Sequence, residues 1–239
     1  MSSTAAPGVW GPRWSRWLGR ILAQGLWATK VVGRSNIPKH GAVIVVTNHM
    51  GFIDGPVIHG VIPRGSHFLV SDHMYAGPFG PLLQRAGQIK VVNAGRGALA
   101  QGLAVLRRGG VVGIFPEGTR GAGAADSVHG GAAWLAIQSG APIVPTALIG
   151  TRRSGESVNV WPRPRRRILV EFGVPTVLMP PEDLKGRAKQ AWAEHAVAEA
   201  LRMQLAETLT HTSLELPNDD EVSDRRRNSG PDTHTKENS

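Results

Sequence analysis

The sequence contains no cysteine. This absence excludes disulfide bonds, a metal site with thiolate ligands and covalent catalysis by a thiol. A chain without cysteine is also compatible with a reducing cytoplasm, although it does not establish that location.

Aromatic residues and long apolar runs are scarce as well. One tyrosine and five phenylalanines are present, and no aromatic residue lies within a recognisable nucleic-acid-binding motif, so we expect no nucleic-acid partner. The longest uncharged run, 129–151, contains Pro142, Pro145 and several glycines. It predicts a helix, a turn and a strand, and the N-terminal stretch lacks the apolar centre of a secretory signal. We therefore expect a chain that does not cross a bilayer.

Charge is what the sequence has in excess. The net charge is +9 and the pI is about 10.9. From Pro217 onward six acidic and four basic residues give −2, so the remainder carries +11. Charge alone therefore indicates an anionic partner for the folded part and does not distinguish phosphate, acidic lipid and nucleic acid. With 41% apolar residues, the 239-residue chain can bury a sizeable core.

Short apolar runs alternate with helical patterns along the body of the chain. This alternation predicts an α/β fold, a layered domain with a largely parallel mixed sheet flanked by helices. The expected strands are Ala42–Thr47, Phe68–Val70, Ile89–Val92, Val111–Phe115, Ile143–Leu148 and Ile168–Phe172, and the expected helices are Pro56–Ile62, Phe79–Ala86, Ala98–Arg107, Gly131–Ser139 and Pro181–Leu209. We expect three regions: an N-terminal helical region over 1–34, a catalytic domain over 35–212 and a disordered tail over 213–239.

The N-terminal stretch Trp10–Trp27 predicts an amphipathic helix. Its apolar residues recur at helical spacing, and three arginines form a second stripe on an adjacent face. Tryptophan beside arginine suits a helix lying in the lipid headgroup region. The alternative is an ordinary helix packed on its own domain. We favour the membrane-docking interpretation because three tryptophans in eight residues are unusual in a core stripe.

A histidine and an aspartate follow the first expected strand. His49 comes directly after this strand, at the edge where α/β sheets present ligand-binding residues. Asp54, five residues later, precedes Gly55 and Pro56, which favour a helix start, so its carboxylate could fold back toward the imidazole. This arrangement suits a general base held by a carboxylate. The alternative is a core histidine and an ordinary helix cap.

The spacing alone is not specific, because His67 and Asp72 have it too. His67, however, lies within an expected strand, so its ring is expected in or beside the sheet. The remaining histidines show no metal-ligand spacing, and we expect no metal site.

A second candidate loop follows the strand that ends at Phe115. Gly118 lets backbone amides approach an anion, Thr119 offers a hydroxyl and Arg120 can hold a phosphate through two hydrogen bonds. Glu117 is expected to hold the loop or to pair with Arg120. The alternative is a surface turn with a local ion pair.

Three ordered motifs together carry a resemblance. Asn48-His49-x4-Asp54, the segment Phe115–Arg120 and the later Ala141–Pro145 resemble the glycerolipid acyltransferases, and among these the PlsC-like 1-acylglycerol-3-phosphate acyltransferases. The resemblance covers about residues 10–210. It implies an O-acyltransferase that moves a fatty acyl chain from acyl-CoA or acyl carrier protein (acyl-ACP) to 1-acylglycerol-3-phosphate, in phospholipid biosynthesis. No bound cofactor is expected.

The resemblance also implies roles for individual residues. His49 would deprotonate the acceptor hydroxyl and Asp54 would orient it. The residues implied to bind substrate are Asn48, Glu117, Gly118, Thr119, Arg120 and Pro145. The stretch Trp10–Trp27 would dock the protein on an anionic membrane surface as a peripheral protein on the cytoplasmic face of the inner membrane.

Two positions depart from the family pattern. Asn93 and Ser71 occupy places where the family commonly has Arg and Lys. Lys90 and Arg96 lie nearby, and either could help to bind the acceptor phosphate. The departures leave open another lysophospholipid or a glycolipid as acceptor. A basic run formed by Arg152-Arg153 and Arg163–Arg167 could add attraction to anionic lipid or could be a solvated loop. A non-catalytic protein that binds anionic membranes or nucleic acid is the alternative of another class.

Overall fold

A computed structural model describes residues 5–92, 95–116 and 130–219. Within these ranges the strands form one sheet in the order β1-β7-β6-β2-β5-β3-β4. The strands are β1 (Ala28–Val32), β2 (Val43–Thr47), β3 (Ser66–Ser71), β4 (Ile89–Val91), β5 (Val111–Ile114), β6 (Ile143–Ile149) and β7 (Arg167–Phe172). Every neighbouring pair is parallel except β6 and β7. The expected mixed, largely parallel sheet is confirmed.

The central strands are apolar on both faces because helices cover both. Every residue of β2, β5 and β6 is buried. Along β2 the side chains alternate between two clusters: Ile44 and Val46 join one core, and Val43 and Val45 join the other. This alternation explains why the strand reads as a continuous apolar run in the sequence.

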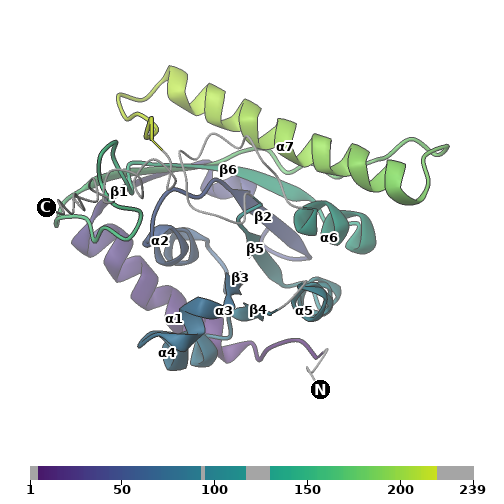
Figure 1. The fold of residues 1–239 in the computed structure, drawn as a ribbon, viewed down its shortest axis with the longest axis horizontal. Coiled ribbons are helices and arrows are strands. Elements are labelled where there is room, and N and C mark those ends of the chain that lie inside the picture. The colour runs from purple at the N-terminus through teal and green to yellow at the C-terminus, as the bar shows by residue number, and fades with distance from the viewer. Residues whose placement is uncertain (1–4, 93–94, 117–129, 220–239) are drawn as a thin grey trace, which may run out of the picture.

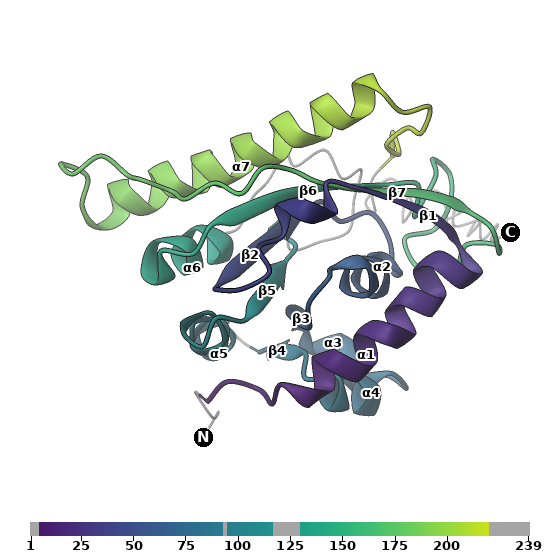
Figure 2. The ribbon, with the colours of Figure 1, turned by 180° about the vertical axis from the view of Figure 1, so that it is seen from behind.

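Helices form the two outer layers (Figure 1). They are α1 (Trp10–Arg20), α2 (Asp54–Val61), α3 (Asp72–Ala76), α4 (Gly80–Arg85), α5 (Arg96–Arg107), α6 (Gly131–Ser139) and α7 (Gly186–Thr210). The first core lies between the sheet and α5, α6 and α7, and the second lies between the sheet and α2 with the π-helical segment Ile21–Leu26. Helix α1 lies outside α2 in both views (Figures 1 and 2).

The N-terminal region is joined to the domain more closely than expected. Strand β1 pairs in parallel with β7, so the sheet begins at Ala28 and residue 34 is not a domain boundary. The helical stretch ends as a π-helical segment before Trp27, which is buried and donates its indole N–H to the carbonyl of Pro162 at 3.2 Å. The expected helix is thus confirmed, but its last tryptophan belongs to the core.

Helix α1 turns its small residues inward. Gly19 and Gly60 bring the backbones of α1 and α2 into contact: a Cβ on Gly60 would lie 2.2 Å from the carbonyl carbon of Gly19. Beside this contact, the hydroxyl of Ser15 lies 2.9 Å from Nε2 of the buried His59. The outward face of the helical stretch carries Trp10, Trp14, Trp17, Leu18 and Ile21, each at least 41% exposed. An ordinary core-packing helix would show the opposite arrangement.

The lengths and hydropathies of the described helices can be compared with what a membrane span requires. Every helix in residues 5–92, 95–116 and 130–219 is too short or too polar to cross a lipid bilayer.

The C-terminal part departs from expectation at both ends of the last helix. Helix α7 begins at Gly186, five residues after the expected Pro181, because Lys185 is extended at its N-cap. The tail was expected to be disordered from residue 213, yet Leu216 packs against both cores and the backbone N–H of Asn218 donates to the hydroxyl of Ser154. The expectation is therefore wrong for residues 213–219. The expected tail beyond these, 220–239, lies outside the described residues.

Candidate active site

The first candidate loop begins where β2 ends. Asn48 is fully buried, and its side-chain amide makes two hydrogen bonds of 2.9 Å with the backbone N–H and carbonyl of Leu148 in β6. The amide thus continues the pairing of β2 with β6 by one position beyond Thr47. This geometry suits Asn48 to positioning His49, and the substrate contact expected of Asn48 stays a prediction.

His49 and Asp54 form the expected pair. Nδ1 of His49 lies 2.8 Å from Oδ2 of Asp54, the first residue of α2. The same oxygen accepts the backbone N–H groups of Met50 at 2.6 Å and Gly51 at 2.8 Å. Because a carboxylate only accepts hydrogen bonds, the imidazole proton lies on Nδ1 and Nε2 carries the lone pair. The carboxyl group is fully buried and the imidazole side chain is 18% exposed, so a substrate can reach the ring but not the carboxylate.

The first residue of the second candidate loop contacts the first candidate loop. The ring of Phe115, directly after β5, stacks on the imidazole of His49, with ring centroids 4.1 Å apart and planes inclined by 24°. Phe115 also contacts Phe68 of β3. The strands β2 and β5 are parallel neighbours, so their carboxyl ends bring the two loops together. Glu117, Gly118, Thr119 and Arg120 lie outside the described residues.

The other His-x4-Asp pair is structural, as its position in a strand predicts. His67 is buried in β3, its Nδ1 lies 2.6 Å from the carbonyl of Gly87, and its Nε2 lies 2.8 Å from a guanidinium nitrogen of Arg108. Both ring nitrogens thus have partners other than Asp72, which begins α3.

Of three further residues implied to bind substrate, Lys90 and Arg96 lie at the far edge of the sheet from His49, and Pro145 lies on the strand next to β2. Lys90 is on the edge strand β4, and its ammonium lies 5.6 Å from the ring centre of Tyr75. Arg96 is exposed at the start of α5, after β4, and β5 and β3 separate β4 from β2, a span of about 14 Å across the sheet. Pro145 is buried in β6 opposite Val46 and shares the sheet face of the first core. Their substrate contacts remain predictions.

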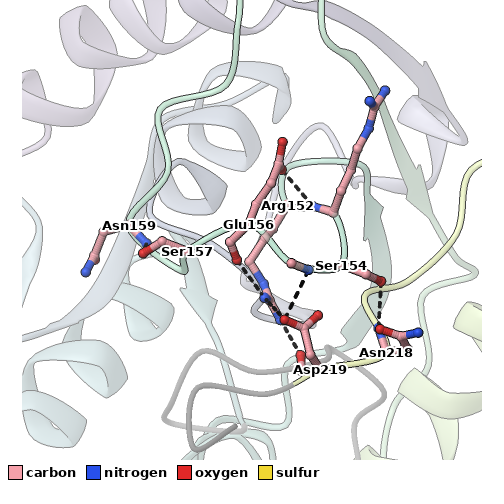
Figure 3. A network of polar contacts seen from close by, with 9 residues as sticks. Arg152, Ser154, Glu156, Ser157, Asn159, Asn218 and Asp219 are labelled. Carbon is pink, nitrogen blue, oxygen red and sulfur yellow. Dashed lines mark hydrogen bonds and ion pairs between the residues drawn. The ribbon is translucent and has the colours of Figure 1, made fainter. Parts of the chain in front are cut away.

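A buried polar network lies beside the turn after β2 that carries His49 and Gly51 (Figure 3). The side chain of Arg152 is fully buried, and its guanidinium contacts a carboxylate oxygen of Asp219 at 3.2 Å and the carbonyl of Glu156 at 2.9 Å. It also donates to the backbone carbonyl of Asp219. A Cβ on Gly51 would lie 3.6 Å from Cβ of Arg152, and the N–H of Phe52 donates to the carbonyl of Val158 at 2.9 Å. The network therefore supports the turn that carries His49.

The basic run is divided between the interior and the surface, because Arg153, Arg163, Arg165 and Arg167 are exposed. Arg152 is in the interior, and Arg166 donates two hydrogen bonds to Glu156. Burial raises the pKa of Glu156, but the hydrogen bonds from Arg166 and Arg153 outweigh it and hold the pKa below its ordinary value. Arg152 and Arg166 are thus packed against acidic partners, while for the exposed arginines attraction to anionic lipid and a solvated loop both stay open. Sequence reasoning missed this network because Asp219 lies 67 residues from Arg152.

A buried carboxylate that holds an accessible imidazole, at the carboxyl edge of a mostly parallel α/β sheet, defines a class of site. Such an arrangement is suited to removing a proton from an incoming hydroxyl by general-base catalysis. The sequence model of the family described as Acyltransferase matches residues 28–149, just over half of the chain. The chain belongs to this family, and the PlsC-like glycerolipid acyltransferase resemblance is confirmed.

Individual relatives agree with the family. The chain is 28% identical over 127 residues to the 1-acyl-sn-glycerol-3-phosphate acyltransferase of Bacillus subtilis, covering 51% of this chain and 62% of the relative. It is 29% identical over 127 residues to the enzyme of the same name from Borreliella burgdorferi, covering 51% of each. The matches thus span less than two thirds of these relatives. The fold is similar to that of the 1-acyl-sn-glycerophosphate (LPA) acyltransferase PlsC from Thermotoga maritima, with a TM-score of 0.61, 22% identity and coverage of 84% of this chain and 80% of that one.

Proposed function

We propose that this protein is an O-acyltransferase that moves a fatty acyl chain from a thioester donor to the free hydroxyl of a lysophosphatidate-like acceptor. The observation that carries the proposal is the contact of Asp54 with Nδ1 of His49, which leaves Nε2 as the proton acceptor. The stacking of Phe115 on the same ring adds that the loop implied to bind phosphate starts beside this base. A base and an anion-binding loop at one edge are what the reaction needs.

The reaction proceeds by direct transfer. Nε2 of His49 takes the proton of the acceptor hydroxyl as its oxygen attacks the thioester carbonyl carbon. Asp54 stabilises the imidazolium that forms. The tetrahedral intermediate then collapses, the carbon–sulfur bond breaks, and the imidazolium returns the proton to the departing thiolate. The products are an ester and a free thiol, and no covalent enzyme intermediate is required.

The proposed acceptor is a specific lysophospholipid, while two kinds of thioester are proposed as donor. The two curated relatives named above are 1-acyl-sn-glycerol-3-phosphate acyltransferases, which supports that acceptor for this chain. Either acyl-CoA or acyl carrier protein would supply the thioester. Ser71, where the family commonly has Lys, bonds to His73 at 2.8 Å. Another lysophospholipid or a glycolipid therefore stays as the alternative acceptor.

Membrane attachment is the second part of the proposal. The outward face of α1 carries exposed tryptophans, and the guanidinium groups of Arg13, Arg16 and Arg20 lie 5.0–5.5 Å from the ring centres of Trp10 or Trp17. Indole rings beside cations suit the headgroup layer of a membrane. We place the protein as a peripheral protein on the cytoplasmic face of the inner membrane.

The proposal is tested by acyl transfer with labelled acyl-CoA and acyl carrier protein on an acceptor panel. His49→Ala is expected to lower turnover by about 10²–10⁴, the usual contribution of a general base. His40→Ala, at an exposed position, is the control and should keep full activity. Near-normal transfer by His49→Ala would contradict the assignment.

Phosphate recognition has its own test. Arg120→Ala is expected to raise the KM for lysophosphatidate by about 10- to 100-fold, the range for a lost hydrogen bond between charged groups. The KM for monoacylglycerol, which has no phosphate, should not change. An equal effect on both acceptors would argue against a phosphate contact by this residue.

A further inference from the structure

A cavity lies at the edge of the sheet opposite His49. It has a volume of about 580 Å³, is open to solvent on one side, and is lined by α1, by the loop before β3 and by the loop before β5. The parallel strands β2, β3 and β5 place their amino ends at this edge and the candidate active site at the other. The cavity is therefore separate from the catalytic base.

The lining of this cavity is strongly basic. Its charged or titratable residues are Arg13, Arg16, Arg64, His67 and Arg108, and no aspartate or glutamate lines it among the described residues. Burial lowers the pKa of Arg64 and Arg108, and burial with the nearby Arg34 and Arg20 lowers the pKa of Arg16. Burial of a charged group is the largest cause of each shift, and Arg16 alone among the three has an added shift from neighbouring like charges. An anion entering the cavity would compensate them.

One guanidinium at the cavity is held in place from the interior. His67 is 3% exposed, and burial lowers the pKa of its ring, which is therefore neutral at pH 7. Its Nδ1–H donates to the carbonyl of Gly87 at 2.6 Å, so Nε2 accepts from Arg108 at 2.8 Å. A guanidinium carries five N–H donors, and this contact uses one. The remaining donors suit the oxygens of a phosphate.

A second guanidinium shapes the wall. Arg64 donates to the carbonyls of Pro38 at 3.0 Å, Gly41 at 2.8 Å and Gly109 at 2.5 Å. These contacts hold the guanidinium of Arg64, and both Arg64 and Gly109 line the cavity. The site is thus assembled before any ligand arrives.

The cavity borders the exposed tryptophan face of α1. Trp17 lines the cavity and is 56% exposed, and the guanidinium of Arg16 lies 5.0 Å from its ring centre. A helix lying in a headgroup layer through Trp10, Trp14 and Trp17 would hold the cavity at the depth of lipid phosphates. We propose that this cavity binds the phosphate-bearing headgroup of an anionic phospholipid, separate from the acceptor at His49. The inference rests on the membrane attachment proposed above and not on the acyl transfer.

The test compares two neighbouring arginines in the full-length protein. Arg108→Gln removes the charge at the cavity, while the glutamine amide can still donate toward His67. Arg107→Gln makes the same charge change one residue earlier, at an exposed position that does not line the cavity. Binding is measured by flotation with vesicles of phosphatidylcholine containing 30% phosphatidate. Arg108→Gln is expected to weaken binding about tenfold, and Arg107→Gln by less than about threefold.

A second pair repeats the comparison on α1. Arg13→Gln lies at the cavity and Arg20→Gln lies on the same helix outside its lining. The first variant should again lose more binding than the second. Equal losses within both pairs would show diffuse surface charge and overturn the headgroup site. No binding of the unmodified protein to anionic vesicles would instead overturn the membrane attachment.

A binding experiment with a water-soluble phosphate compound tests whether the cavity prefers a lipid headgroup to a free phosphate ligand. Titration of the unmodified protein with sn-glycerol 3-phosphate should show binding at least a hundredfold weaker than to the vesicles, because the soluble compound makes no contact with the tryptophan face. Equally tight binding that is lost in Arg108→Gln would assign the cavity to a soluble ligand and overturn the proposal. All arms can be run in the His49→Ala background, so they do not depend on turnover.

Discussion

The imidazole of His49 lies flat against the ring of Phe115, with a centroid separation of 4.1 Å. The two residues are 66 positions apart in the sequence; Phe115 directly follows β5, and His49 is the second residue after β2. The stack restrains the plane of the imidazole from one side, while Asp54 fixes its Nδ1 edge. The orientation of the proposed base therefore depends on both candidate loops.

Replacing this aromatic ring should reduce catalysis without removing it. Phe115→Leu keeps an apolar side chain but loses the stack, which is worth about 0.5–1.5 kcal/mol. We expect kcat/KM to fall about two- to tenfold in the acyl-transfer assay. The unfolding midpoint serves as the control, and a loss of activity that only follows a loss of fold would contradict this role.

The negative charge of the Asp54 side chain should matter more for turnover than the size of that side chain. Asp54→Asn keeps the size, but its amide can no longer fix the Nδ1 proton as a carboxylate does, so we expect turnover to fall about 10²–10⁴-fold. Asp72→Asn is the matched control, because Asp72 has the same spacing from His67 and no contact with its ring nitrogens. Comparable losses in the two variants would refute the pairing as the source of the effect.

The buried contact between Arg152 and Asp219 should contribute to stability. Asp219→Asn removes the negative charge that faces the buried guanidinium, a change that costs about 3 kcal/mol of unfolding free energy by the general behaviour of buried pairs. Asp183→Asn, at an exposed position, should change it by less than about 0.5 kcal/mol. Urea unfolding of both variants measures the difference. Equal stabilities would show that residues 213–219 do not hold the loop.

The buried histidine under α1 predicts a pH dependence of stability. Burial, with the nearby His67 and Arg16, lowers the pKa of His59 to about 4. An unfolded histidine binds a proton below about pH 6.5, so between these values the unfolded state binds more protons and stability falls as pH falls. The full effect is about 3 kcal/mol, present above pH 6.5 and lost progressively toward pH 4.

The measurement is urea unfolding between pH 4.5 and 7.5 for the unmodified protein and His59→Gln. The variant should show a shallower decline, because its side chain does not titrate. Parallel curves would mean that His59 protonates as readily in the folded state as in the unfolded one.

The sequence predicted what depends on neighbouring residues. Gly131–Ser139 begins and ends as expected, and Asp54 starts its helix and folds back to His49 as the glycine and proline after it indicated. Such features follow from local patterning and turn chemistry. The strand at Ala28–Val32 escaped prediction because its partner, β7, lies 139 residues away in register.

In the candidate site, too, features set by neighbouring residues could be predicted and contacts between distant residues could not. The base and its carboxylate could be found from spacing and strand position. The role of Asn48 could not, because its partner Leu148 is 100 residues distant, and an amide that extends a sheet has no signature in local sequence. The stacking of Phe115 could have been suspected from its place directly after a parallel strand.

The contact of Gly19 with Gly60 has a mechanical consequence. Backbones that touch without intervening side chains leave little room for one helix to shift against the other, so we expect α1 and α2 to move together. The first of these presents its indoles outward, and the second starts at the carboxylate that steers the imidazole. A change in how α1 lies on a membrane would therefore move α2, and with it Asp54 and Nε2 of His49.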